Sequence, residues 1–197
     1  MPDSNITKKA LAQALKDLML QEPLSKISVG DICTRCSMNR KSFYYHFKDK
    51  YDLVNWIYYT EFLDALQKKP AQGWDVALRL CEYFAENVKF YQNALAVQGQ
   101  NSFYEYFGQV LSTVISHNLE PYMKDVEYFD FYIKLYSDAY RALIIHWLTD
   151  GTQIPPAKFV ELLAKATEGF YYVVNEVGLS GQEATSSMDS QNPSASK

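Results

Sequence analysis

Apolar residues recur at helical spacing through most of the chain. In the first segment Ile6, Ala10, Ala14 and Leu18 lie four residues apart, which places them on one face of an amphipathic helix. Further segments of the same period run over about 51–69, 73–96, 103–120, 127–149 and 156–177, separated by stretches that contain proline, glycine or asparagine. Clean alternation of apolar and polar residues, the mark of a half-buried strand, is absent from these segments. The pattern predicts an all-α protein.

Three helix starts within the first fifty residues share one arrangement. Each has a capping residue preceded by an apolar residue and followed four positions later by another: Ile6-Thr7 with Leu11, Ile27-Ser28 with Ile32, and Met38-Asn39 with Phe43. This is an N-cap with a hydrophobic staple across it, and Ser28 with Asp31 adds a capping box. We therefore expect helices to begin near residues 8, 29 and 40. The last two are joined by only three residues, so residues 28–47 have helix-turn-helix spacing.

The third of these helices is short and has two unlike faces. It runs from Arg40 to Phe47, about 12 Å at 1.5 Å per residue, a length that suits the DNA major groove. A rotation of about 100° per residue gathers Phe43, His46 and Phe47 on one side. Lys41 and Tyr45 point the other way, with Arg40 and Tyr44 on the flanks, and Lys48 and Lys50 follow at once. One face is expected to be core and the other to carry cations and phenols.

Composition and charge narrow the class of protein. The chain has 197 residues, 48% hydrophobic and 21% charged, which is enough to bury a core. Its net charge of −4 divides unevenly, because residues 1–50 carry nine Lys and Arg against five acids, whereas the remainder is acidic. A basic head on an acidic body indicates that only the head meets a polyanion. No apolar run approaches membrane-spanning length and the N-terminus has no secretory signal, so we expect a soluble, cytoplasmic protein.

The stretches Ile-Ser-Val-Gly-Asp-Ile-Cys (27–33) and Met-Asn-Arg-Lys-Ser-Phe-Tyr-Tyr-His-Phe-Lys-Asp-Lys-Tyr-Asp-Leu (38–53) closely resemble the TetR family of bacterial transcriptional regulators. The resemblance implies a three-helix DNA-binding domain over residues 4–64 and a larger helical ligand-binding and dimerisation domain over 65–178. It also implies that the double-stranded DNA contacts come from Thr7, Ser28, Asn39, Arg40, Lys41, Ser42, Tyr44, Tyr45, His46 and Lys50. In this interpretation Thr7 and Ser28 cap helices close to the DNA backbone, and Lys50 holds a phosphate at the start of the fourth helix.

Two residues depart from the family pattern. Ser37 stands where the turn often has Gly, which costs about 1 kcal/mol if that residue needs a positive φ. Lys41 stands where Gly is common and adds a long cation that would change the choice of operator. The same stretch also resembles a subgroup linked to dihydroxyacetone-kinase operons, some of whose members act as activators with a protein partner.

The body is rich in aromatic residues, and its sites are less defined. Most of these rings are expected to be core; a functional interpretation adds an apolar pocket with a few polar groups to orient a small-molecule effector. The candidates for those groups are Gln98, Asn101, His117, Tyr140, Arg141 and His146. By position, the last two helices resemble the dimer bundle of the family, with Leu143, Trp147, Leu163, Phe170 and Val174 at the interface. A two-fold homodimer implies a palindromic operator. Residues 179–197 are expected to form a disordered tail.

Three functional hypotheses follow. The first is a regulator that binds DNA through its head and a small molecule through its body. The second has the same architecture, but its body recruits a protein co-regulator. The third, an enzyme, finds little support, because no phosphate-binding Gly-rich loop, metal-binding His pair or nucleophile elbow is present, and we predict no catalytic residue, metal or cofactor. Cys33 and Cys36 form an isolated C-x-x-C without a second pair, which favours core packing over zinc binding.

Overall fold

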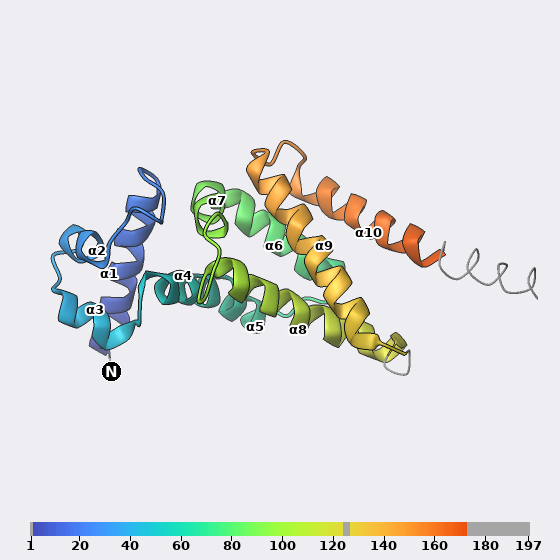
Figure 1. Ribbon diagram of the computed structural model, residues 1–197, viewed down its shortest axis with the longest axis horizontal. Helices are drawn as coiled ribbons and strands as arrows, with labels where there is room; N and C mark the ends of the chain where they lie inside the picture. The colour runs from blue at the N-terminus through green and yellow to red at the C-terminus, as the bar shows by residue number, and fades with distance from the viewer. Residues whose placement is uncertain (1, 124–126, 173–197) are drawn as a thin grey trace, which may run out of the picture. The chain divides into compact units, whose positions relative to one another are not determined.

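The computed structural model describes residues 2–123 and 127–172, and every regular element within these ranges is helical, which confirms the all-α prediction (Figure 1). The order is α1 (Pro2–Met19), α2 (Val29–Arg35), α3 (Arg40–His46), α4 (Lys50–Tyr58), η1 (Tyr59–Leu63), α5 (Asp64–Lys68), α6 (Trp74–Glu86), α7 (Val88–Leu95), α8 (Phe103–Met123), α9 (Phe129–Thr149) and α10 (Pro156–Tyr172). The chain divides into two compact units, Met1–Pro156 and Ala157–Lys197, so α10 is described separately from the rest.

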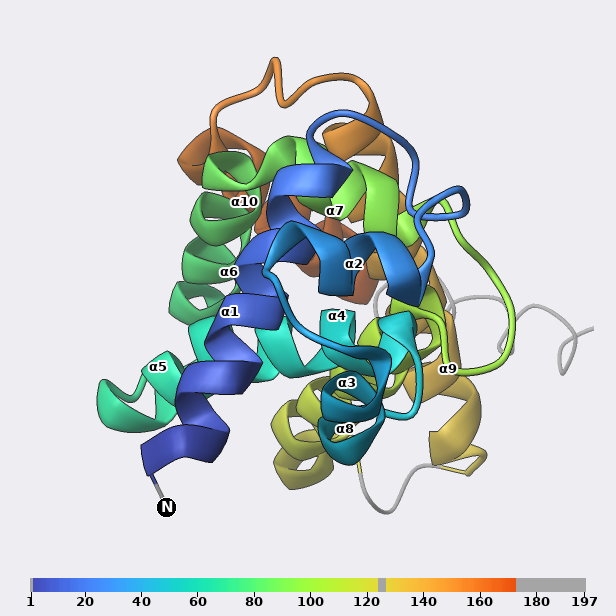
Figure 2. The same ribbon diagram turned by 90° about the vertical axis from the view of Figure 1, so that its left-hand side faces the viewer.

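Helices α1, α2 and α3 form the head, and α1 packs against both of the others as well as against α4 (Figure 2). Leu11 and Leu15 of α1, Ile32 of α2, Phe43 of α3 and Leu53 of α4 are fully buried. These residues come from four elements and bury each other's apolar surface, which is the main stabilising contribution in so small a module.

The predicted start of the first helix at residue 8 is wrong. Helix α1 begins at Pro2, so Thr7 lies inside it and cannot serve as its N-cap. Ile6, the expected partner of Leu11 in a staple, is 64% exposed. Pro2 has no backbone N–H to leave unsatisfied, and proline is favoured in the first helical turn. The first turn of α1 therefore forms at Pro2, before Thr7.

The other two predicted helix starts are confirmed. Ser28 caps α2 through a full capping box, in which its Oγ accepts from the Asp31 amide at 3.2 Å and its own amide donates to Asp31 Oδ2 at 2.8 Å. These hydrogen bonds from Ser28 lower the pKa of the Asp31 carboxyl. Asn39 caps α3, with its Oδ1 accepting from the Ser42 amide at 2.8 Å.

The body differs from the predicted segments at three places. The segment expected at 73–96 breaks at Asn87, whose side chain donates to the Tyr83 carbonyl at 2.9 Å and so competes with the helical hydrogen bonds. The segment at 51–69 contains the π-helical turn η1, in which Thr60 Oγ1 donates to the Trp56 carbonyl at 2.8 Å. Helix α8 continues through Pro121 to Met123 instead of ending before the proline.

An aromatic cluster forms the core of the body. Tyr58 of α4 is 1% exposed, and seven other rings lie within 6.5 Å of its ring centroid: Phe62, Tyr83, Phe84, Tyr91, Phe103, Tyr106 and Phe107. Most of these pairs are tilted or edge-to-face, the arrangements that aromatic quadrupoles favour. Helices α8 and α9 run along one another beside this cluster. None of the helices within the described ranges combines the length and apolar content that a membrane crossing requires.

The turn between α2 and α3 yields a direct test of backbone strain. Ser37 has φ of 56°, the left-handed conformation that glycine adopts without a Cβ penalty. We expect Ser37→Gly to raise the free energy of unfolding by about 0.5–1 kcal/mol, the strain relieved less the entropy cost of glycine. Urea denaturation followed by circular dichroism measures this change.

The matched control is Ser25→Gly, at an exposed residue that does not have a positive φ. In this variant the free energy of unfolding should fall by up to about 1 kcal/mol, because glycine raises the entropy of the unfolded chain. Equal losses in both variants would contradict the assignment of strain to Ser37.

Candidate nucleic-acid interface

Helix α3 buries one face and exposes the other, as its sequence predicts. Phe43 is fully buried, and Phe47, directly after the helix, is 3% exposed. Tyr44 and Tyr45 are 54% and 80% exposed, and Arg40 and Lys41 are also exposed. The buried phenylalanines orient the helix, so the cations and phenols share the solvent face.

Six of the ten residues that the family resemblance assigned to DNA contact lie together. They line a depression of about 280 Å³ between the first half of α1 and the exposed face of α3: Thr7, Asn39, Lys41, Ser42, Tyr45 and His46. The His46 ring stands edge-on to the Tyr45 ring, with centroids 4.9 Å apart. Thr7 therefore lies beside α3 although it caps no helix. The structure thus brings these six residues together around one depression.

The depression offers the chemistry that duplex DNA requires. Lys41 and the neighbouring Arg40 bring positive charge, and the Tyr45 phenol is able to donate to phosphate oxygens or base edges. Helix α3 has seven residues and is about 10 Å long, so it fits across a major groove about 12 Å wide.

Lys50 has a different environment from the one its sequence position suggested. Its ammonium group donates to the carbonyl oxygens of Leu24 at 2.6 Å, Ser25 at 3.2 Å and Ile27 at 2.6 Å. All three N–H donors are thus used to hold the loop between α1 and α2. Burial lowers the pKa of this ammonium, and the carboxylates of Asp31 and Asp49 oppose that effect. The predicted phosphate contact would have to compete with these carbonyl groups.

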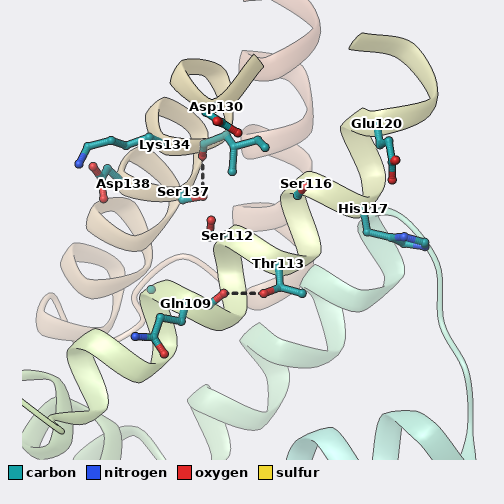
Figure 3. Close-up of a pocket in the computed structure, with 12 residues that line it drawn as sticks. Gln109, Ser112, Thr113, Ser116, His117, Glu120, Asp130, Lys134, Ser137 and Asp138 are labelled. Carbon is teal, nitrogen blue, oxygen red and sulfur yellow. Dashed lines mark hydrogen bonds between the residues drawn. The ribbon is translucent and has the colours of Figure 1, made fainter. Parts of the chain in front are cut away.

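A second cavity lies in the body. A groove of about 830 Å³, lined mostly by polar residues, runs between α8 and α9 (Figure 3). Ser112 of α8 and Ser137 of α9 point toward one another across it. Lys134 and Asp138 flank it on α9, and His117 lies farther along α8.

The six residues proposed to orient an effector do not meet in one pocket. Only His117 lines the groove. Arg141 lies over the Tyr104 ring at 4.3 Å and pairs with Asp138 at 2.6 Å, next to the groove rather than in its wall. Gln98 and Asn101 are exposed between α7 and α8. The Tyr140 ring packs against Trp74, and His146 is exposed in the last turn of α9. Sequence reasoning missed the serines of the groove, because small polar residues on a helix carry no distinct signal.

The predicted dimer residues have unlike environments. Leu143 is 45% exposed, whereas Trp147 is buried and its indole N–H donates to the Ile154 carbonyl at 2.7 Å, inside its own protomer. Leu163 is also buried. The Phe170 side chain and the whole of Val174, like the expected tail at 179–197, lie outside the described residues. The exposed Phe131 and Leu135, on the α9 face that leads to Leu143, were missed, although their four-residue spacing is visible in the sequence.

The cysteines belong to the packing of the chain. Cys33 and Cys81 are buried, and burial raises the pKa of the Cys81 thiol to about 12. Burial also raises the pKa of both thiols of the C-x-x-C pair. Within the residues that the structure describes, no three His, Cys, Asp or Glu side chains come close enough to hold a metal ion.

Comparison with known proteins identifies the class. The sequence profile described as "Bacterial regulatory proteins, tetR family" matches residues 11–57, and that described as "Transcriptional regulator C-terminal region" matches 74–169. The two matches cover the head and most of the body. The chain belongs to the TetR family of DNA-binding transcriptional regulators, which are not enzymes.

Among individual proteins, the chain is similar to the HTH-type dhaKLM operon transcriptional activator DhaS of Lactococcus lactis subsp. lactis (strain IL1403), with 34% identity over 99 residues. That match covers 49% of this chain and 53% of DhaS, so the chain spans about half the length of this relative. The solved structure of a dihydroxyacetone kinase operon activator DhaS superposes with a TM-score of 0.57 at 25% identity, over 82% of this chain and 96% of that one. A TetR regulator from Streptococcus agalactiae 2603V gives a TM-score of 0.65 at 18% identity, covering 82% and 93%, and supports the fold alone.

The role of Lys50 is tested by its removal. Lys50→Ala leaves the partly buried Ile27 carbonyl without its donor and removes the side-chain donor of the Leu24 carbonyl, which also accepts from the Ile27 amide at 3.3 Å. We therefore expect the free energy of unfolding to fall by about 2 kcal/mol. The exposed Lys48→Ala should change it by less than about 0.5 kcal/mol. Urea titrations of both variants make the comparison. An Ala variant of Lys50 as stable as the parent would show that the ammonium does not hold the loop.

Proposed function

We propose that the protein is a homodimer that binds a palindromic operator through paired α3 helices and responds to an effector bound by its body. The observation that supports this most directly is the exposed set of Arg40, Lys41, Tyr44 and Tyr45 beside Thr7, on an otherwise acidic protein. One such face per protomer, related by a two-fold axis, matches two half-sites about one DNA turn apart.

The surface of α9 supports the dimer. Phe131, Leu135 and Ala142 are exposed at spacings of four and seven residues along one side of the helix, and the exposed Leu143 follows Ala142. Leu162 of α10 is likewise 44% exposed. Exposed apolar residues on one helix, although Asp138 interrupts them, are typical of a protein–protein interface. We propose that a second copy of the chain covers it.

The dimer is tested at Leu143. Leu143→Glu places a carboxylate within the proposed interface, and since the side chain is exposed in the protomer, the fold should survive. We expect a shift to monomer at micromolar concentration by light scattering, with a loss of operator affinity of at least about tenfold because the two heads no longer act together. Asn118→Glu, which adds the same charge at an exposed position of α8 outside the groove, is the control. A parent protein that is monomeric at this concentration would contradict the proposal.

The operator contacts are tested at Lys41. Binding sites selected from random duplexes first define the operator. Lys41 lies on the exposed face of α3, so Lys41→Ala should relax the preference at one base position per half-site by about 1–3 kcal/mol, with a smaller loss on scrambled DNA.

The control is Lys26→Ala, in the loop between α1 and α2, which removes one exposed charge outside the α3 face. This variant should weaken binding to the operator and to scrambled DNA slightly and leave the sequence preference unchanged. If Lys41→Ala weakens binding to operator and to scrambled DNA equally, Lys41 contacts phosphate and does not distinguish bases.

For the effector we propose the groove between α8 and α9. Its serine hydroxyls, with Lys134 and Asp138 at the rim, suit a small hydroxylated or charged molecule better than an apolar one. A ligand of the native state raises the thermal midpoint, so a thermal-shift screen of polar metabolites tests this assignment. Ser112→Phe, which fills the groove, should abolish the shift.

A protein co-regulator is the second candidate. Similarity to an activator of the dhaKLM operon favours a regulator of a dihydroxyacetone-kinase operon, and the open polar groove is also accessible to a partner protein. Genomic footprinting names the neighbouring genes and tests this target. Purification of the DNA-bound protein from its own cells, followed by mass spectrometry, would then separate a protein partner from a small molecule.

A further inference from the structure

A single side chain of α7 holds the end of α1. The Asn93 amide nitrogen donates to the carbonyl oxygens of Met19 at 3.0 Å and Glu22 at 2.9 Å, and Asn93 Oδ1 accepts from the Leu24 amide at 3.1 Å. Carbonyl groups at a helix C-terminus have no partner within the helix, and Asn93 supplies one from the body. Figures 1 and 2 both show α7 beside the C-terminal end of α1.

A second polar connection joins the same two parts one turn earlier in α1. Lys16 of α1 pairs with Glu61 of η1 at 2.7 Å, and Glu61 accepts from the Tyr83 hydroxyl of α6 at 2.9 Å. The Tyr83 hydroxyl lies 2.7 Å from that of Tyr91, on α7. Helix α1 is thus attached to the body at two points along its length.

The residue before Asn93 makes the corresponding contact at another helix end. Gln92 donates to the Leu148 carbonyl at 2.5 Å, near the C-terminus of α9. Two consecutive side chains of α7 therefore bind the last turn of α9 and the end of α1. The eight-residue helix between them is anchored in the core by Tyr91 and Ala94, both fully buried.

We propose that Asn93 is a positioning residue for operator binding, which fixes the direction in which α1, and with it α2 and α3, leaves the body. Apolar contacts tolerate small rotations, whereas three hydrogen bonds to one amide are satisfied in only one orientation. A helix attached at one point is able to pivot. Helix α1 is attached at two points, at Lys16 by Glu61 and at the Met19 carbonyl by Asn93. The consequence for the spacing of two heads rests on the dimer proposed above.

The test measures the orientation within one chain, so it does not depend on the dimer. Spin labels are placed at Lys9→Cys on α1 and Glu105→Cys on α8, both exposed positions, after replacement of the three native cysteines by alanine. One labelled chain is diluted into unlabelled protein, and the electron–electron distance distribution is recorded. We expect Asn93→Ala to widen this distribution by about twofold, as the head samples more orientations.

Asn87→Ala is the matched control. It removes an asparagine at the start of the same helix, whose amide donates to the Tyr83 carbonyl and not to the head. This variant should keep the parental distribution. Asn93→Asp, which retains the acceptor for the Leu24 amide but loses both donors, gives a second test should Asn93→Ala fail to fold.

DNA binding supplies the functional measurement. With the selected operator, Asn93→Ala should lose about tenfold in affinity for the full site but stay within about twofold on a single half-site, because only binding by two heads depends on their spacing. If Asn93→Ala only destabilised the head, the affinity for the full site and the affinity for the half-site would both fall. An unchanged distance distribution in both Asn93 variants would overturn the proposal. A widened distribution with no loss on the full operator would confine Asn93 to a structural role and overturn it as well.

Discussion

An isolated helix as short as the seven-residue α3 does not keep its shape in water, because its nucleation cost exceeds what so few hydrogen bonds return. The remainder of the head compensates for this. Asn39 satisfies the first free amides of α3, and Phe43 and Phe47 anchor its inner face against α1, α2 and α4. Arg40, Lys41, Tyr44 and Tyr45 are consequently presented to solvent by a helix that contributes little stability of its own.

The same constraint explains why the connections of the head are polar and specific. The loop after α1 contains few buried side chains, so its carbonyl groups are held by the Lys50 ammonium from one side and by the Asn93 amide from the other. Each group donates to backbone acceptors of this loop, and burial makes such acceptors costly to leave unpaired. The loop is thus hydrogen-bonded to α4 on one side and to α7 on the other, and α1 packs against both α2 and α3.

Much of the head was predictable because its determinants are local. A cap at Ser28 or Asn39 involves residues within four positions, and the strained turn at Ser37 follows from the two helices it must join. The start of α1 was not predictable in this way. A capping residue such as Thr7 also fits inside a helix when residues favourable to the helix precede it. Lys50 was assigned to phosphate from its place in the family motif; its three carbonyl partners lie 23 to 26 positions away, and no local pattern reports them.

The body was harder to interpret because periodicity identifies an apolar face but not what covers it. Trp147 and Leu143 lie four positions apart on α9, yet one is inside the protomer, held by the Ile154 carbonyl, and the other is exposed. The candidate effector residues were chosen as polar groups in an aromatic region, and that choice assumed a cavity among the rings. The rings instead fill the space around Tyr58 with one another.

The tyrosines of that cluster then have a physical role other than ligand capture. A core needs apolar surface, which phenylalanine supplies, but Tyr83 and Tyr91 add hydroxyl groups that reach Glu61 and, through it, Lys16 of the head. Burial raises the pKa of both phenols, so they stay protonated and able to donate. The aromatic core of the body thereby ends in a polar connection to α1, and packing and head orientation depend on the same side chains.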